Sequence, residues 1–211
     1  VERCLNGDSY GDRRGGAYGV AALVKGLGIA ALKQHDLIPT LEDACANGSP
    51  PSKQGALFAF ELLCERLRLL FEPYVIVILP LLLKCFSDGS DHVRKAAHGA
   101  AKAIMKNLSQ HGVKLVLPKI LEALEDTAWR TKQAATQLLG AMAYCAPRQL
   151  GTCLPQIIPK LTQAFSDTHP KVRDGGKKAL RDVRSVIRNP EVSSLSEVLL
   201  SALTEPAKHT Q

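Results

Sequence analysis

The sequence repeats itself about every 40 residues. A basic residue followed two positions later by a pair of small residues occurs five times, with steps of 40, 41, 38 and 41 residues, at Arg13, Lys53, Arg94, Lys132 and Arg173. A proline that follows an apolar residue keeps the same rhythm, at Pro39, Pro80, Pro118 and Pro159. A period of this length is typical of helical hairpins of the HEAT or armadillo kind, because one hairpin cannot bury its apolar face alone and must stack on its neighbours.

This period predicts an all-α fold, a right-handed α-solenoid of HEAT repeats with about ten helices, about four full hairpins and no β-sheet. The expected units are a partial one at 1–27, four hairpins at 28–71, 72–109, 110–146 and 147–189, and a second partial one at 190–211. The chain starts without Met, and its ends, 1–5 and 193–204, look like parts of unfinished hairpins. We therefore expect a single array over residues 1–211 that is an excerpt of a longer solenoid.

The segment 73–108 shows the expected hairpin most clearly. Its first helix should bury an apolar stripe at spacings of three and four residues, formed by Val75, Ile76, Leu79, Leu82, Leu83 and Phe86. A turn of short polar residues at 87–90 separates it from a second helix that begins near Asp91. The repeated proline falls inside the first helix of each hairpin, where it should bend the axis.

The turns carry a second repeated feature. Asp88, Asp126 and Asp167 share one turn position, and we expect them to form a ladder of ion pairs between units with basic residues early in the second helices, among them Arg94, Lys132 and Arg173. The segment 46–52 is rich in Gly, Ser and Pro, which favours an exposed turn longer than its counterparts.

Composition excludes several classes of protein. No stretch reaches the roughly 18–20 apolar residues of a membrane span, and no targeting segment is recognisable. The six cysteines form no CxxC pair, so we interpret them as buried apolar residues in a reducing compartment. The six histidines lack HxxxH and HExxH spacing, and we predict no metal site.

No catalytic or nucleotide-binding motif stands out. The segment Arg13–Gly19 resembles a phosphate loop only superficially, because no strand precedes it, and we expect its glycines to let two helices approach closely. The pair Gly176-Lys177 is followed by Lys178, where a Walker motif requires Ser or Thr. We predict a binding protein without cofactor, and no enzyme.

The charge indicates the kind of partner. With 27 Lys and Arg against 20 Asp and Glu the net charge is +7, which favours an acidic partner, RNA included. One stripe spans an arc of about 80° on the last full hairpin and consists of Arg173, Lys177, Arg181, Arg184 and Arg188. It is either a solvated face or a contact for phosphate or an acidic protein surface.

Further candidate contacts are Arg13 and Arg14, and Arg130 and Lys132 beside Trp129. We interpret Trp129 as a residue that pins its turn to a neighbouring unit rather than as a platform for a nucleic-acid base.

Five segments in one order resemble a known family. They are RRGGAYGVAALVKGLGI at 13–29, FAFELL at 58–63, FEPY at 71–74, AWRTKQA at 128–134 and IRNPE at 187–191. They are similar to the central HEAT region of the general control nonderepressible scaffold family, which is itself similar to the HEAT domain of fungal elongation factor three.

The resemblance implies a cytosolic adaptor that docks on ribosomes and recruits an ABC-class ATPase, so that the kinase of translation initiation factor two alpha responds to starvation or stalling. It also implies that the kinase binds through another region of the full protein. The alternatives are a segment of an elongation-factor-three-like ATPase and, less favoured by the basic charge, a nuclear transport receptor or phosphatase scaffold.

Overall fold

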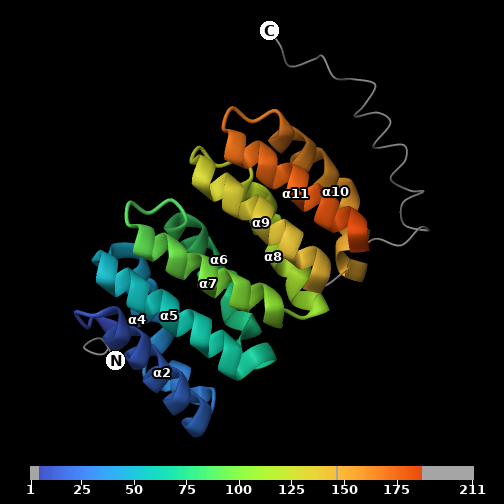
Figure 1. Cartoon of the computed structure of the whole chain (residues 1–211). Helices are drawn as coiled ribbons and strands as arrows, with labels where there is room; N and C mark the ends of the chain where they lie inside the picture. Colours follow the sequence, from blue (N-terminus) through green and yellow to red (C-terminus); the bar gives the residue numbers. More distant parts are fainter. Residues whose placement is uncertain (1–4, 146, 187–211) are drawn as a thin grey trace, which may run out of the picture. The chain divides into compact units, whose positions relative to one another are not determined.

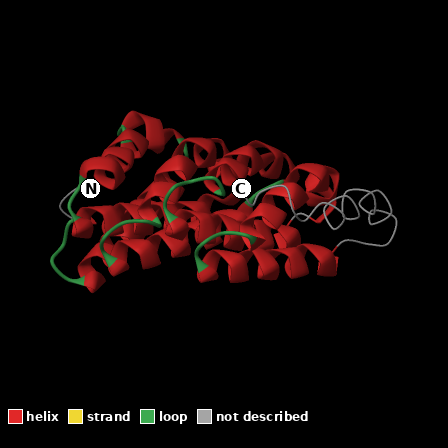
Figure 2. Ribbon diagram, turned by 90° about the horizontal axis from the view of Figure 1, so that it is seen from above, coloured by secondary structure: helices red, strands yellow, loops and turns green. Residues whose placement is uncertain are grey.

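The computed structural model describes residues 5–145 and 147–186. Within these ranges the elements are helices joined by turns, without a strand, as the 40-residue period predicts (Figure 2). They are α2 (Tyr10–Leu27), α3 (Ala30–Gln34), α4 (Leu37–Asn47), α5 (Pro50–Leu67), the short 3-10 helix η1 (Arg68–Phe71), α6 (Glu72–Cys85), α7 (Asp91–Asn107), α8 (Gln110–Ala123), α9 (Trp129–Cys145), α10 (Pro147–Phe165) and α11 (Pro170–Val186). None of the described helices is both long and apolar enough to cross a membrane. The expected half-hairpin at 193–204 lies outside the described residues.

The chain separates into two compact units, Val1–Lys119 and Ile120–Gln211. In the first unit, α5 lies between α2 and α7, while α4 and α6 pack on each other and on α5 and α7 respectively (Figure 1). In the second unit, α9 lies along α11, and α10 packs against both. Each unit thus places second helices of hairpins side by side and backs them with first helices. That all 211 residues form one array stays a prediction.

Small residues make the close packing of the second helices possible. Ala96 and Ala97 in α7, and Ala134 and Ala135 in α9, are at most 3% exposed. The apolar stripe of α6 is buried as predicted, with one exception: Ile76 is 38% exposed. It follows directly after Val75, and a rotation of 100° per residue turns it towards the edge of the buried face.

Three of the four repeated prolines lie inside first helices, namely Pro80 in α6, Pro118 in α8 and Pro159 in α10. The prediction is wrong for Pro39, which is the third residue of α4. A proline inside a helix removes the bond to the carbonyl four residues earlier and clashes with it. The helix is instead interrupted at His35 and Asp36, with φ of 46° at Asp36.

The expected long turn at 46–52 is also wrong, because just two residues, Gly48 and Ser49, separate α4 from α5. The hydroxyl of Ser49 accepts a hydrogen bond from the N–H of Ser52, and Pro50 and Pro51 occupy the first helical positions. Proline is well suited there, since its missing N–H would have no partner in the helix. The Pro-rich composition therefore marks the start of a helix.

Glycines serve different purposes at different repeats. A Cβ atom on Gly15 or Gly19 would meet nothing within 4 Å, so these two do not mediate a close helix approach as expected. Gly175 and Gly176 of α11 do, because a Cβ there would collide with Oγ1 of Thr136 or come within 3.1 Å of Ala164.

The described thiols are free and mainly buried, as predicted for Cys45, Cys64 and Cys85, while Cys153 is half-buried. Burial raises the pKa of the Cys64 thiol to about 12, which keeps it protonated and unreactive at neutral pH.

Candidate interaction surface

The arginines at the repeated basic position bind their own turns. In α7, Nη1 of Arg94 donates to the carbonyls of Asp88 and Gly89 at 2.7 and 2.9 Å. In α11, Nη1 of Arg173 donates to Asp167 and to the next carbonyl at 2.8 and 2.9 Å. Each guanidinium therefore closes the turn that precedes its helix, so these two residues do not reach the next hairpin as the expected ladder requires.

The lysines at the same position reach forward by 35 residues. Nζ of Lys53 lies 2.9 Å from Oδ2 of Asp88, and Nζ of Lys132 lies 2.9 Å from Oδ2 of Asp167. Burial alone would raise the pKa of Asp167, but the hydrogen bonds from Lys132 and from the N–H of His169 outweigh it and hold the pKa below its ordinary value. The predicted ladder is thus confirmed for Lys132.

Arg13 and Arg14 are engaged within the first unit. Arg13 donates to the carbonyls of Gly7 and Asp8 at 2.6 and 2.9 Å and to Oε1 of Gln54 at 2.9 Å. Arg14 forms a two-point ion pair with Glu61 at 2.8 and 2.9 Å, and its guanidinium carbon lies 4.8 Å from the centre of the Phe58 ring. The hydrogen bond from Arg14 to Glu61 raises the pKa of the guanidinium.

The stripe on α11 separates into bound and exposed members. Lys177, Arg181 and Arg184 are exposed, whereas Arg173 is half-buried and holds its turn. Arg188 lies outside the described residues. Sequence reasoning missed two further exposed cations of the same helix, Lys171 and Lys178. The helical angle of Lys178 places it outside the predicted arc, so the pairing of α11 with α9 was needed to recognise it.

The pair α9 and α11 concentrates positive charge. Together the two helices contain eight Lys or Arg, two Asp and no Glu. Two of the cations, Lys132 and Arg173, are bound within the fold as described above. The remaining excess gives this pair of helices an electrostatic preference for anionic partners.

Trp129 connects the first turns of these two helices. Its ring stacks on His169 with 3.8 Å between ring centroids and 7° between planes. The guanidinium carbon of Arg130 lies 4.6 Å, and Nζ of Lys171 5.4 Å, from its centroid. The interpretation that Trp129 pins its turn to the neighbouring unit is confirmed. His169 stands one repeat step of 40 residues after Trp129, a signal from which it could have been found.

These contacts support binding rather than chemistry. Among residues 5–145 and 147–186, no group of three or more His, Cys, Asp or Glu side chains could hold a metal ion. The exposed groups on α11 are cations on a regular helix, which can offer charge-assisted hydrogen bonds to phosphate or carboxylate groups.

Comparison with known sequences confirms the resemblance. The family model described as EF3 N-terminal HEAT repeat matches residues 13–180. The chain is 55% identical over 212 residues to the stalled ribosome sensor GCN1 of Homo sapiens and 42% identical over 200 residues to the eIF-2-alpha kinase activator GCN1 of Saccharomyces cerevisiae. These matches cover 100% and 94% of this chain but 8% of each relative. Elongation factor 3 of Gonapodya prolifera is 28% identical over 199 residues, which is 93% of this chain and 18% of that protein.

Solved structures support the fold class. A structure on microtubule plus end tracking by XMAP215, CLIP-170 and EB1 has a TM-score of 0.67 and 18% identity, and the match covers 96% of this chain and 86% of that chain. Kap121p bound to Pho4p has a TM-score of 0.58 and 11% identity, covering 98% and 21%. At these identities the likeness concerns the solenoid fold alone.

Proposed function

The chain belongs to the family of EF3 N-terminal HEAT repeats, and from this premise we propose that it is a non-catalytic scaffold segment that binds ribosomes and an ABC-class ATPase partner. In this role it supports activation of the eIF-2-alpha kinase during amino-acid starvation or ribosome stalling. The kinase itself binds through another region of the full protein. The segment acts in the cytoplasm and requires neither a membrane nor a small-molecule substrate.

One observation carries this proposal, the excess of exposed cations on α11. Lys177, Arg181 and Arg184 have exposed side chains on one face of a helix whose first turn is held by Trp129 and His169. A rigid row of cations binds a phosphate backbone without prior ordering, and each phosphate contact releases counterions. The names of the relatives, stalled ribosome sensor and kinase activator, support the ribosome as the source of that backbone.

Ribosome co-sedimentation at two salt concentrations tests the proposal. The variant Lys177→Ala, Arg181→Ala, Arg184→Ala should bind ribosomes more weakly, and its dependence of log affinity on log salt should be flatter by about two to three units. The matched control Lys25→Ala, Lys33→Ala, Lys102→Ala removes the same charge from exposed positions in the first unit and should bind like the parent chain.

Adding the N-terminal segment of the ABC partner to the same assay separates the two binding partners. If the triple variant loses that segment and still binds ribosomes, α11 contacts an acidic protein surface. If the variant keeps both partners with unchanged affinity and salt slope, the proposed role of α11 is wrong. The site would then be sought first at Arg130, which is exposed, and next at Arg13, Arg14 and Lys132.

The second candidate function is a segment of an elongation-factor-three-like ATPase. The matching family model and the relative from Gonapodya prolifera favour it. Walker motifs in the flanking sequence would support the ATPase, and further HEAT repeats on both sides would support the scaffold. A transport receptor or phosphatase scaffold shares the fold, but the net charge of +7 does not suit a basic cargo.

A further inference from the structure

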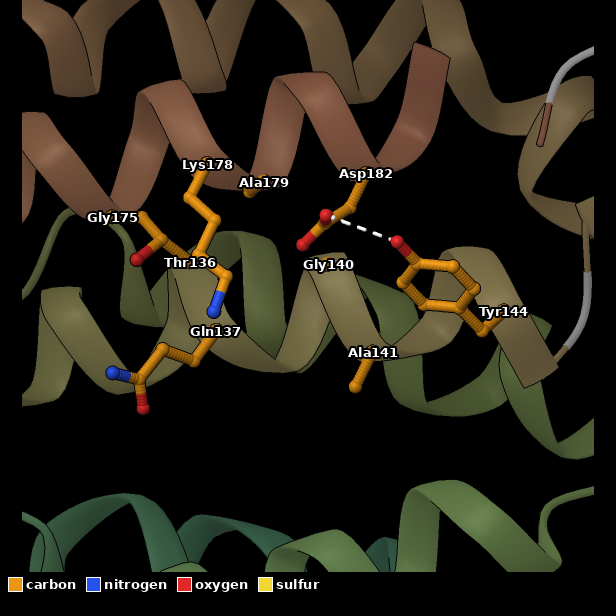
Figure 3. A pocket seen from close by; sticks show the side chains of 9 residues that line it. All are labelled: Thr136, Gln137, Gly140, Ala141, Tyr144, Gly175, Lys178, Ala179 and Asp182. Carbon is orange, nitrogen blue, oxygen red and sulfur yellow. Dashed lines mark hydrogen bonds between the residues drawn. The ribbon is translucent and has the colours of Figure 1, made fainter. Parts of the chain in front are cut away.

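A hollow of about 200 Å³ lies between α9 and α11 in the second unit (Figure 3). Small residues form its floor, Gly140 and Ala141 on α9 and Gly175 and Ala179 on α11. A Cβ on Gly140 would come within 2.9 Å of Oδ2 of Asp182. The two helices therefore approach each other closely, and the absence of larger side chains along their seam leaves the hollow open.

Polar side chains stand at the two ends of the hollow. At one end, the hydroxyl of Tyr144 donates to Oδ1 of Asp182 at 3.1 Å, and Tyr144 is 61% exposed (Figure 3). At the other end, Lys178 extends from α11 towards Gln137 of α9. Both Lys178 and Gln137 are exposed.

Charge around the hollow selects an anionic occupant. Lys177, Lys178 and Arg181 are exposed on α11, and α9 contributes no acidic residue at all. The nearest carboxylate, that of Asp182, already accepts the hydroxyl of Tyr144. A carboxylate or phosphate group beside the hollow would thus meet more cations than anions.

The floor distinguishes between the two anionic classes. Single-stranded RNA is bound by stacking planes and by hydrogen bonds to base edges. The floor offers small aliphatic groups instead, and the hydroxyl of Thr136 already donates to the carbonyl of Gln133 at 2.6 Å. An apolar side chain would fill the floor and displace water from it. Acidic residues next to that side chain would reach the cations on the rim.

We propose that the groove between α9 and α11 binds an acidic peptide segment of a partner protein, with one apolar side chain in the hollow and carboxylates on Lys178 and Arg181. This deepens the proposed function and rests on its claim that α11 is a partner-binding helix. It adds the chemistry of the segment that the partner must present.

Two synthetic probes test the groove. The first is a short fluorescein-labelled oligoglutamate peptide with one central leucine, and the second has glycine in place of that leucine. Fluorescence anisotropy should show that the leucine peptide binds about tenfold more tightly, as expected for partial burial of one aliphatic side chain. Equal affinities of the two peptides would overturn the proposal.

Variants locate the binding. Ala141→Leu fills the half-exposed floor, so it should abolish the advantage of leucine over glycine, whereas Ala46→Leu on the exposed side of α4 should preserve it. Lys178→Gln should weaken both peptides, and Lys102→Gln should weaken neither. Gln137→Glu places a negative charge at the rim and should repel both peptides, which provides a second test should Ala141→Leu fail to fold.

The two proposals fail in different ways. Loss of ribosome binding in the Lys177, Arg181, Arg184 variant tests the cationic helix, whereas the difference between the leucine and glycine peptides tests the groove. If Ala141→Leu leaves that difference intact, the groove is not the site. If Ala141→Leu instead abolishes binding of an oligouridine probe, the occupant is RNA and the peptide proposal is wrong.

Discussion

Two aspartates each join three parts of the chain. Oδ2 of Asp88 binds Lys53 of the preceding hairpin, Oδ1 accepts the N–H of Ser90, and the carbonyl oxygen accepts Arg94. Asp167 repeats this arrangement in the second unit, with the corresponding partners Lys132, His169 and Arg173. Each aspartate thereby fixes a turn, the start of a helix and the contact to the previous hairpin at the same time.

These aspartates should make the fold sensitive to acid. Burial raises the pKa of Asp88, but the N–H of Ser90 and the ammonium of Lys53 more than compensate, so its folded pKa is lowered, like that of Asp167. Because the folded pKa is the lower one, the unfolded chain takes up protons first. The stabilisation is complete above about pH 4 and is lost as the pH falls through the folded pKa.

Urea unfolding of the parent chain and of the variant Asp88→Asn, Asp167→Asn checks this expectation. At pH 7 the variant should be less stable by about 1.5–3 kcal/mol per site, the range for hydrogen bonds to charged groups. At pH 3 the difference should shrink, because the parent chain has then lost the same interactions. A difference that stays constant between pH 7 and pH 3 would contradict the assignment.

Each helix buries small residues where a neighbouring helix approaches and leaves others in open space. In α2, a Cβ atom added to Gly15 or Gly19 would have no neighbour within 4 Å, although these glycines resemble the packing glycines of other repeats in sequence. In α11, Gly175 is in contact with Thr136 of α9. The same residue type therefore costs helix stability in α2 and permits helix packing in α11.

Alanine substitutions should separate the two roles. Gly15→Ala and Gly19→Ala should each raise the free energy of unfolding by about 0.5–1 kcal/mol, since glycine in a helix costs backbone entropy. Gly175→Ala should lower it, because the added methyl group must displace the side chain of Thr136. Chemical denaturation measures all three. A stabilising Gly175→Ala would show that α9 and α11 are less tightly packed than described.

At the scale of the whole molecule, helices contact near neighbours in the repeat order. Helix α5 packs on α2 and α7 in the first unit, and α9 packs on α11 in the second. In such arrays stability is approximately a sum over repeats and their interfaces. A local defect should therefore weaken its own unit more than the other.

Two overpacking variants test this locality by hydrogen exchange. Ala96→Leu enlarges a buried residue of α7, and Ala135→Leu does the same in α9, each at a cost of about 1–3 kcal/mol. Ala96→Leu should reduce protection mainly in α5 and α7, and Ala135→Leu mainly in α9 and α11. A uniform loss of protection in both units would mean that the chain unfolds as one cooperative body. The exposed variant Ala22→Leu should change neither unit.

The sequence alone determined the helical fold, the hairpin order and the buried small pairs, since these follow from apolar spacing and from the 40-residue period. Arg173, Lys177, Arg181 and Arg184 could be assigned to one helix face in the same way. It also predicted that Trp129 fixes a turn, because a large aromatic ring beside a turn must find a covering partner.

Interactions between hairpins were decided by the tertiary structure. Lys132 and Arg173 occupy the same position in the repeat, yet one reaches the next hairpin and the other closes its own turn. The groove between α9 and α11 has the same origin. It combines Lys178, Gly140 and Tyr144, which are separated in sequence and carry no shared motif. Local spacing sets which side of a helix is buried, but only the packing of two helices decides which exposed side chains face each other.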